Sequence, residues 1–159
     1  MSLINHRRRS ARWHGASQKV GQSAAPLFLD RIDIQCEITP VPFKDISKVE
    51  PGEPSAVIRE RVIKARDIQT ARYKDFKGIH CNAQMTERML HQFAEPDASS
   101  IDMLRMAMER LKLSARAYSR ILKVARTIAD LDGSEQVQLP HIAEAVGYRN
   151  LDRSDWSER

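Results

Sequence analysis

The sequence is poor in cysteine and in long apolar runs, and each shortage excludes a class of protein. Its two cysteines, Cys36 and Cys81, lie far apart and belong to no CxxC pair, so neither a zinc ribbon nor a disulfide framework is expected. No apolar run approaches the length of a membrane span, and the N-terminus lacks the apolar core of a signal peptide. These absences predict a reduced, cytoplasmic protein with no membrane partner.

The short motifs of autonomous catalysis are also missing. The sequence contains no GxxxxGK[ST] phosphate loop, no GxGxxG turn, no HExxH helix and no GxSxG elbow. Its five histidines are scattered, and no cysteine or histidine cluster has the spacing of a metal site. We therefore expect no metal site, and no enzymatic activity from this chain alone.

Basic charge is concentrated at the N-terminus. Residues 1–25 hold five of the 26 Lys and Arg residues and no acidic residue, whereas the remaining 21 basic residues balance 21 acidic ones. This segment shows no sustained period, which predicts a disordered arm. It could bind nucleic-acid phosphates through Arg7, Arg8, Arg9 and Arg12, or it could be a solvated tail.

One segment has the alternation of a β-strand. Within residues 26–38, Ile32, Ile34, Cys36 and Ile38 alternate with polar residues, and prolines follow up to residue 54. A lone strand cannot complete its own hydrogen-bond ladder, so its partners must lie in another chain or in a part of the protein that is missing here. We predict an orphan strand and a proline-rich connector over residues 26–54.

The rest of the sequence favours helices, because aromatic residues make up only 6% of it and apolar residues recur at helical spacing. We expect N-caps at Asn82, at one of residues 97–100 and at Ser114, and a helix stop at Gly133. The predicted fold is mainly α, a bundle of about five helices within residues 55–148, followed by a frayed tail at residues 149–159. The expected helical segments are 55–76, 82–93, 97–113, 114–133 and 138–146.

The fourth of these segments carries cations along its polar face. Its apolar face consists of Ala115, Tyr118, Ile121, Leu122, Ala125, Ile128 and Ala129, and its other face carries Arg116, Arg120, Lys123 and Arg126. Arg116 falls in the first turn, where the helix dipole and free N–H groups favour an anion. A phosphate there would meet a guanidinium and N–H donors together. The alternatives are an ion pair with Glu109 or a solvated side chain.

Four stretches together resemble a known family. FLDRIDI, GEPSAVIRERVIKARDIQTARY, NAQM and AMERLKLSARAYSRILKVARTIADLDGSEQVQLPHIAEAVGYRNLDR are similar, in order and spacing, to the C-terminal part of the magnesium-chelatase-like AAA+ ATPases of the bacterial ComM (YifB) type. The resemblance covers about residues 26–153. It implies a P-loop core domain that ends near an LLDRID strand, followed by a helical lid that closes over ATP between the subunits of a hexamer. The orphan strand would be the last strand of that core.

The resemblance also implies roles for three arginines. Arg116 matches the sensor 2 arginine, which contacts the γ-phosphate of ATP, and Arg31 of the LDR motif matches the arginine finger presented to a neighbouring subunit. Arg120, one turn after Arg116, is a second-choice sensor and nucleotide-binding residue. Both catalytic roles would use guanidinium charge to stabilise a phosphoryl-transfer transition state.

The expected function is therefore that of a lid in a hexameric motor that uses ATP and Mg²⁺ to remodel DNA, with branch migration as the task. Its partners would be its own P-loop core, the neighbouring subunits and DNA. Walker A, Walker B and sensor 1 are missing from the sequence, so no nucleotide should bind this chain tightly. The alternatives are a nucleic-acid-binding helical module that uses the basic arm, and the lid of a true chelatase subunit that inserts Mg²⁺ into a porphyrin.

Overall fold

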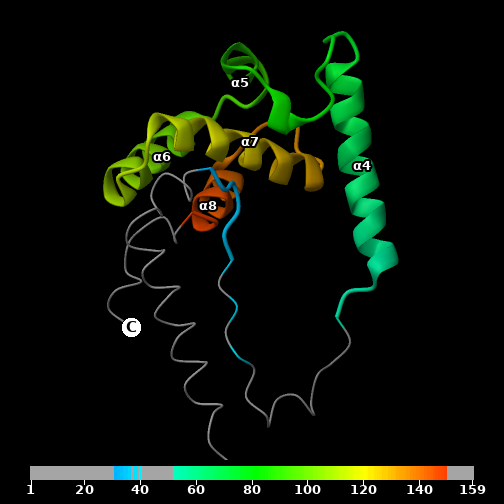
Figure 1. The fold of residues 1–159 in the computed structure, drawn as a ribbon, viewed down its shortest axis with the longest axis horizontal. Helices are drawn as coiled ribbons and strands as arrows, with labels where there is room; N and C mark the ends of the chain where they lie inside the picture. Colours follow the sequence, from blue (N-terminus) through cyan, green and yellow to red (C-terminus); the bar gives the residue numbers. More distant parts are fainter. Residues whose placement is uncertain (1–30, 37, 39, 41–51, 150–159) are drawn as a thin grey trace, which may run out of the picture.

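The computed structural model of the chain describes residues 31–36, 38, 40 and 52–149. Within them, α7 lies at the centre, with α5 above it, α8 below it and α4 standing upright to one side (Figure 1). The predicted five helices are confirmed in these residues. The basic arm at residues 1–25 lies outside them, and so does the predicted tail at 149–159 except for Arg149, which is buried. The elements are α4 Ser55–Tyr73, the 3₁₀ helix η1 Asn82–Gln84, α5 Glu87–Phe93, α6 Ala98–Leu111, α7 Ala115–Leu131 and α8 Leu139–Gly147.

The predicted strand is not formed over residues 31–36, which corrects the expectation from the sequence. Among the described residues, the one β-type pairing is an isolated bridge between Pro96 and Val137. The physical reason is that no neighbouring strand among the described residues provides hydrogen-bond partners for it. The backbone of residues 31–36 instead bonds to helices, as described below.

The caps predicted for α6 and α7 are confirmed. The side chain of Asp97 accepts a hydrogen bond from the Ser100 N–H at 2.8 Å, and the Ser114 hydroxyl accepts one from the Ala117 N–H at 3.2 Å. Each satisfies one of the backbone donors that a helix start leaves free. Helices α6 and α7 thus begin where the sequence predicts.

The predicted cap at Asn82 is wrong. The N-cap of α5 is Thr86, whose hydroxyl accepts from the Met89 N–H at 3.4 Å. Asn82 begins the short η1 and is 1% exposed, because its amide bonds to other buried polar groups. Its side chain is therefore not available to cap a helix.

Gly133 ends the turn after α7 with a positive φ of 70°, a conformation that L side chains rarely adopt. A Cβ added there would meet nothing within 4 Å, so Gly133→Ala should cost only backbone strain, about 1 kcal/mol of unfolding free energy. Gly147 is the matched control, because it also has open space but lies inside α8 without a positive φ. Gly147→Ala should raise stability by up to about 1 kcal/mol. Urea denaturation measures both changes in stability. If Gly133→Ala and Gly147→Ala change the free energy of unfolding equally, the turn geometry at Gly133 is contradicted.

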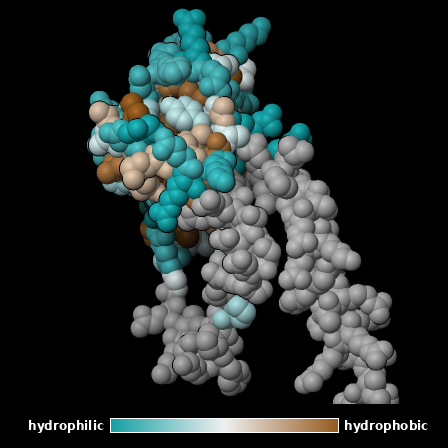
Figure 2. Space-filling view, turned by 90° about the vertical axis from the view of Figure 1, so that its left-hand side faces the viewer, coloured by the Kyte–Doolittle hydropathy of each residue, from teal (hydrophilic) through white to brown (hydrophobic). Residues whose placement is uncertain are grey.

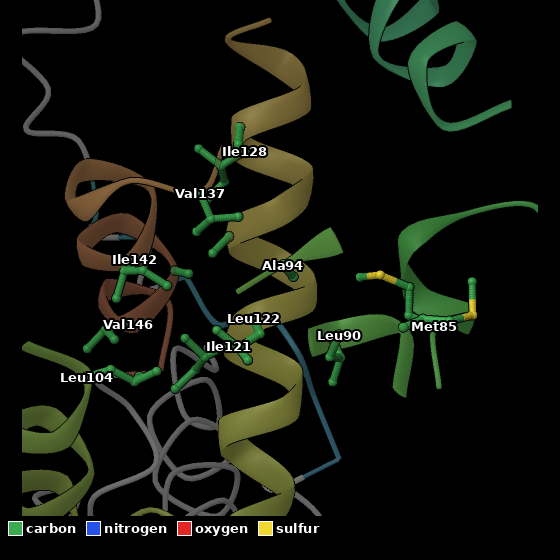
Figure 3. Packing of buried hydrophobic residues seen from close by; sticks show 14 of the residues in the cluster. Met85, Leu90, Ala94, Leu104, Ile121, Leu122, Ile128, Val137, Ile142 and Val146 are labelled. Atoms are coloured by element: carbon green, nitrogen blue, oxygen red, sulfur yellow. The ribbon is translucent and has the colours of Figure 1, made fainter. Parts of the chain in front are cut away.

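The hydrophobic core forms between α7 and its neighbours. Figure 3 shows Ile121 and Leu122 of α7 among side chains from α5, α6 and α8. The apolar face predicted for α7 is buried from Ile121 onward, whereas Ala115 is exposed and Tyr118 is partly exposed. The buried apolar cluster comprises Tyr73, Met85, Met89, Leu90, Ala94, Leu104, Ile121, Leu122, Ala125, Ile128, Ala129, Val137, Ile142, Ala145 and Val146.

Helices α4 and α6 each leave more than one large apolar side chain at the surface. On α6, Leu104 is buried, but Ile101, three residues earlier, is 48% exposed. Figure 2 shows small hydrophobic patches scattered among mostly hydrophilic side chains on the face that it presents. On α4, Ile58 and Val62 are exposed, and burial begins at Ala65. The first helix is thus exposed over its N-terminal half.

Candidate functional site

Arg116 lies where the sequence predicts, in the first turn of α7 directly after Ala115. Its side chain is exposed, and no acidic residue occupies this turn. The Ser114 cap satisfies one of the N–H donors at this helix end. An anion that approached the start of α7 would therefore meet N–H groups and a guanidinium on one surface. Its contact with ATP stays a prediction.

Arg120 lies one turn further along α7 and contacts residues near the start of the described chain. Its Nη1 donates to the carbonyl oxygen of Arg31 at 2.6 Å and also forms an ion pair with Asp33. The Arg120 side chain is 27% exposed, so this pair is only partly shielded from water. The structure thus brings the backbone of Arg31 to the arginine stripe of α7.

A second set of bonds fixes the same stretch to the end of α8. The Arg149 guanidinium donates to the carbonyl of Ile32 at 2.9 Å, and the Gln35 N–H donates to the carbonyl of Tyr148 at 2.9 Å. Residues 31–36, hereafter the docked segment, run beside α8 in Figure 1. The Arg31 side chain remains exposed. Two of the three predicted ATP-site arginines, Arg31 and Arg120, are therefore in contact.

The expectation that Arg126 shares the polar face of α7 is wrong, because Arg126 is 1% exposed. Its guanidinium donates to the carbonyl oxygens of Glu135 at 2.8 Å and Ser134 at 2.5 Å, and pairs with Asp130 at 3.0 Å. Sequence analysis missed this pair. The available signal was the i, i+4 spacing of Arg126 and Asp130 on one helix.

Asp130 is the centre of a buried polar network with Arg72, Asn82 and Arg126. Both carboxylate oxygens accept from Arg72, at 2.8 and 2.5 Å, and Asn82 donates to one of them at 2.8 Å. The Asp130 side chain is 0% exposed and that of Arg72 is 13% exposed. The network joins α4, η1 and α7, so it fixes the long first helix to the centre of the bundle.

The network changes the acidity of its members. Burial opposes ionisation of Asp130, but hydrogen bonds from Arg72 and Asn82 outweigh it and hold the pKa of the carboxyl below its usual value. Burial lowers the pKa of Arg126, whereas the hydrogen bond to Asp130 raises the pKa of Arg72. The folded protein therefore holds Asp130 as an anion.

This pKa shift predicts a loss of stability in acid. The folded-state pKa of Asp130 lies below the unfolded value of about 3.9, so its stabilising effect is complete above that pH and is lost as the pH falls through the folded-state pKa. Urea denaturation from pH 7 to pH 3 should show that the free energy of unfolding of the wild type falls below about pH 4. The same fall should be smaller in Asp130→Asn. Hydrogen bonds from Ser100 also lower the pKa of Asp97, so Asp97 accounts for part of the fall in stability that remains in this variant. An unchanged profile in Asp130→Asn would contradict the assignment.

In the described part of the chain, no group of three or more His, Cys, Asp or Glu side chains is arranged to hold a metal ion. In the same residues, no helix combines the length and apolar character that crossing a membrane requires.

Comparison with known proteins gives consistent matches. Residues 52–149 match the family described as magnesium chelatase, subunit ChlI C-terminal. The chain is 40% identical to the competence protein ComM of Haemophilus influenzae and 41% identical to the YifB protein of Escherichia coli, each over 79% of this chain and 24% of the relative. A Mycobacterium bovis protein is 30% identical over 82% of this chain and 25% of its own length. The chain thus spans about a quarter of the length of these curated relatives.

Proposed function

Because this chain belongs to the magnesium chelatase ChlI C-terminal family and is the C-terminal part of a ComM/YifB-type protein, we propose that it is the lid that completes an ATP site between subunits of a hexameric motor. In this proposal the lid supplies arginines, while the P-loop core supplies the phosphate loop and the Mg²⁺ ligands. ATP with Mg²⁺ is the cofactor of the whole protein. The core and the neighbouring subunits are the partners of the lid.

The observation that carries the proposal is the placement of Arg116. It is an exposed guanidinium in the first turn of a 17-residue helix that the Ser114 side chain caps. A γ-phosphate at this position would accept hydrogen bonds from a planar cation, and free N–H groups of α7 would add to the positive field. Arg116 would therefore sense the γ-phosphate, which is present in ATP and absent in ADP.

Arg31 supplies the second charge in the proposal. Its side chain is exposed while its backbone carbonyl is held by Arg120, so the guanidinium can reach outward from a fixed base. Presented to the ATP of a neighbouring subunit, it would stabilise the charge that develops during phosphoryl transfer. In this role Arg31 couples hydrolysis to subunit contact.

We propose DNA as the substrate of the whole motor, with branch migration as its task. The support is the name of the Haemophilus relative, a competence protein, to which this chain is 40% identical. The basic arm that could add phosphate contacts, with Arg7, Arg8, Arg9 and Arg12, lies outside the described residues. The porphyrin-chelatase alternative has support of its own, because the family that residues 52–149 match is described as magnesium chelatase.

ATP hydrolysis by the full-length protein tests the proposal. Turnover should be measured with no DNA, with linear duplex and with a four-way junction, and branched DNA should stimulate it most. Hydrolysis that needs Arg116 and responds to the junction supports a lid in a DNA motor. Hydrolysis that responds to a porphyrin but not to any DNA would replace this proposal with the chelatase alternative.

A further inference from the structure

Arg120 joins two parts of the chain that are 89 residues apart in sequence. One part is α7, which carries Arg116 one turn before Arg120 on the same stripe. The other is the docked segment, whose first residue is Arg31. A single guanidinium therefore connects the helix of one candidate ATP-site arginine to the backbone of the other.

This contact sets the Arg120 guanidinium against an anion of its own chain before any nucleotide binds. Its Nη1 is shared between the Arg31 carbonyl and the Asp33 carboxylate, so its charge is already opposed by an anion of the same chain. A phosphate would have to displace Asp33 from a charge-assisted hydrogen bond, the stronger class of such bonds. Arg116, in contrast, lies beside the free N–H groups of the helix start.

We propose that Arg120 is a positioning residue, which holds the backbone of Arg31 against α7 so that the Arg31 guanidinium projects from a fixed point. This inference rests on the proposed function, because it assigns Arg120 a part in presenting the finger. Asp33 is its partner in that task. Arg120 therefore acts through Arg31 and does not bind ATP.

The bonds from Arg149 and Tyr148 make the assignment testable, because they anchor the docked segment independently of Arg120. The Gln35 N–H bonds to the Tyr148 carbonyl at 2.9 Å and so reports whether the segment remains in place. Without Arg120, the bonds of Ile32 and Gln35 can still form, but we expect the segment to open from α8 more often, so that the Gln35 N–H exchanges faster although the segment does not detach completely.

Amide hydrogen exchange in the isolated chain is the first experiment. Arg120→Ala should speed exchange at Gln35 several-fold, and Asp33→Asn should do so to a smaller extent. Lys123→Ala is the matched control, because Lys123 lies on the same stripe but donates to the Ala83 carbonyl at 3.0 Å, away from the docked segment. If exchange at Gln35 in Arg120→Ala matches wild type and Lys123→Ala, the positioning role is overturned.

Steady-state ATP hydrolysis by the full-length protein is the second experiment. Arg120→Ala should lower kcat about tenfold with the KM for ATP unchanged, and Arg120→Lys, which keeps the charge opposite Asp33, should restore part of that loss. Combining Arg120→Ala with Arg31→Ala should lower kcat no further than Arg31→Ala alone, because both act through one group. A raised KM in Arg120→Ala, or an unchanged kcat, would overturn the inference.

The two proposals fail in different ways. If Arg31→Ala leaves turnover unchanged, the finger assignment in the proposed function fails, whatever Gln35 exchange shows. If Arg31→Ala lowers turnover while Arg120→Ala leaves turnover unchanged, the proposed function stands and the positioning role falls.

Discussion

Replacing Asp130 by alanine is expected to lower the free energy of unfolding by about 3–5 kcal/mol, the usual cost of removing one partner of a buried ion pair. The Asp130 side chain is 0% exposed and accepts hydrogen bonds from Arg72, Asn82 and Arg126. Its removal leaves the fully buried Arg126 with only the carbonyls of residues 134 and 135 as partners. The loss is large because an uncompensated charge stays behind.

Urea denaturation followed by circular dichroism measures this loss, with Asp102→Ala as the matched control. Asp102 also pairs with an arginine, Arg105 at 3.0 Å, but both side chains are more than half exposed. The free energy of unfolding of Asp102→Ala should therefore fall by about 0.5 kcal/mol or less. Asp130→Asn keeps the shape of the side chain without its charge, and it should still be destabilised by most of the amount expected for Asp130→Ala. If Asp130→Ala and Asp102→Ala lose similar amounts, the buried network does not hold α4 to α7 in solution.

The sequence allowed the fold to be predicted wherever the determining information is local. Asp97 and Ser114 precede apolar periodic segments and cap the helices that follow, and Gly133 supplies the positive φ that ends the turn after α7. Each of these features is decided by residues within one turn of the chain. The helix starts at residues 98 and 115 could therefore be predicted correctly.

Contacts between distant segments could not be predicted in the same way. Helical periodicity placed Arg126 among the surface cations, because spacing gives the angle of a residue on a helix and not its partner. Its burial depends on Asp130, on Arg72 58 residues before that aspartate, and on Asn82. Asn82 was likewise predicted as a cap, because its local pattern fits one. Only the assembled bundle determines where these polar groups pair.

The candidate site divides along the same line. The position of Arg116 in the first turn follows from Ser114 and the apolar period, and the structure confirms it. The link between Arg120 and Arg31 spans 89 residues and depends on how the docked segment meets α7 and α8. Alternation in this segment suggested a strand, but its backbone groups bond to an arginine side chain and to the end of α8. No local pattern distinguishes these two outcomes.

In the full-length protein, Arg116→Ala should lower the turnover of ATP about a hundredfold, the scale expected when a group that stabilises developing phosphoryl charge is removed. The affinity for ATP should fall more than the affinity for ADP, because only ATP offers the γ-phosphate. Arg116→Lys should recover part of the loss, since an ammonium keeps the charge but cannot make the bidentate contact. Hydrolysis assays and nucleotide titrations measure these effects.

Stability and assembly decide what a loss of turnover in Arg116→Ala would mean. Because Arg116 is exposed, the substitution should change the unfolding free energy by about 0.5 kcal/mol or less, and light scattering should show the proposed hexamer intact. Arg110→Ala, an exposed arginine in the last turn of α6, is the matched control and should keep wild-type turnover. The dipole of α7 disfavours a cation at its first turn, so the helix itself gains nothing from an arginine there. Full turnover in Arg116→Ala would refute its sensor role, whereas lost turnover in an intact oligomer would show that this position serves the nucleotide and not the fold.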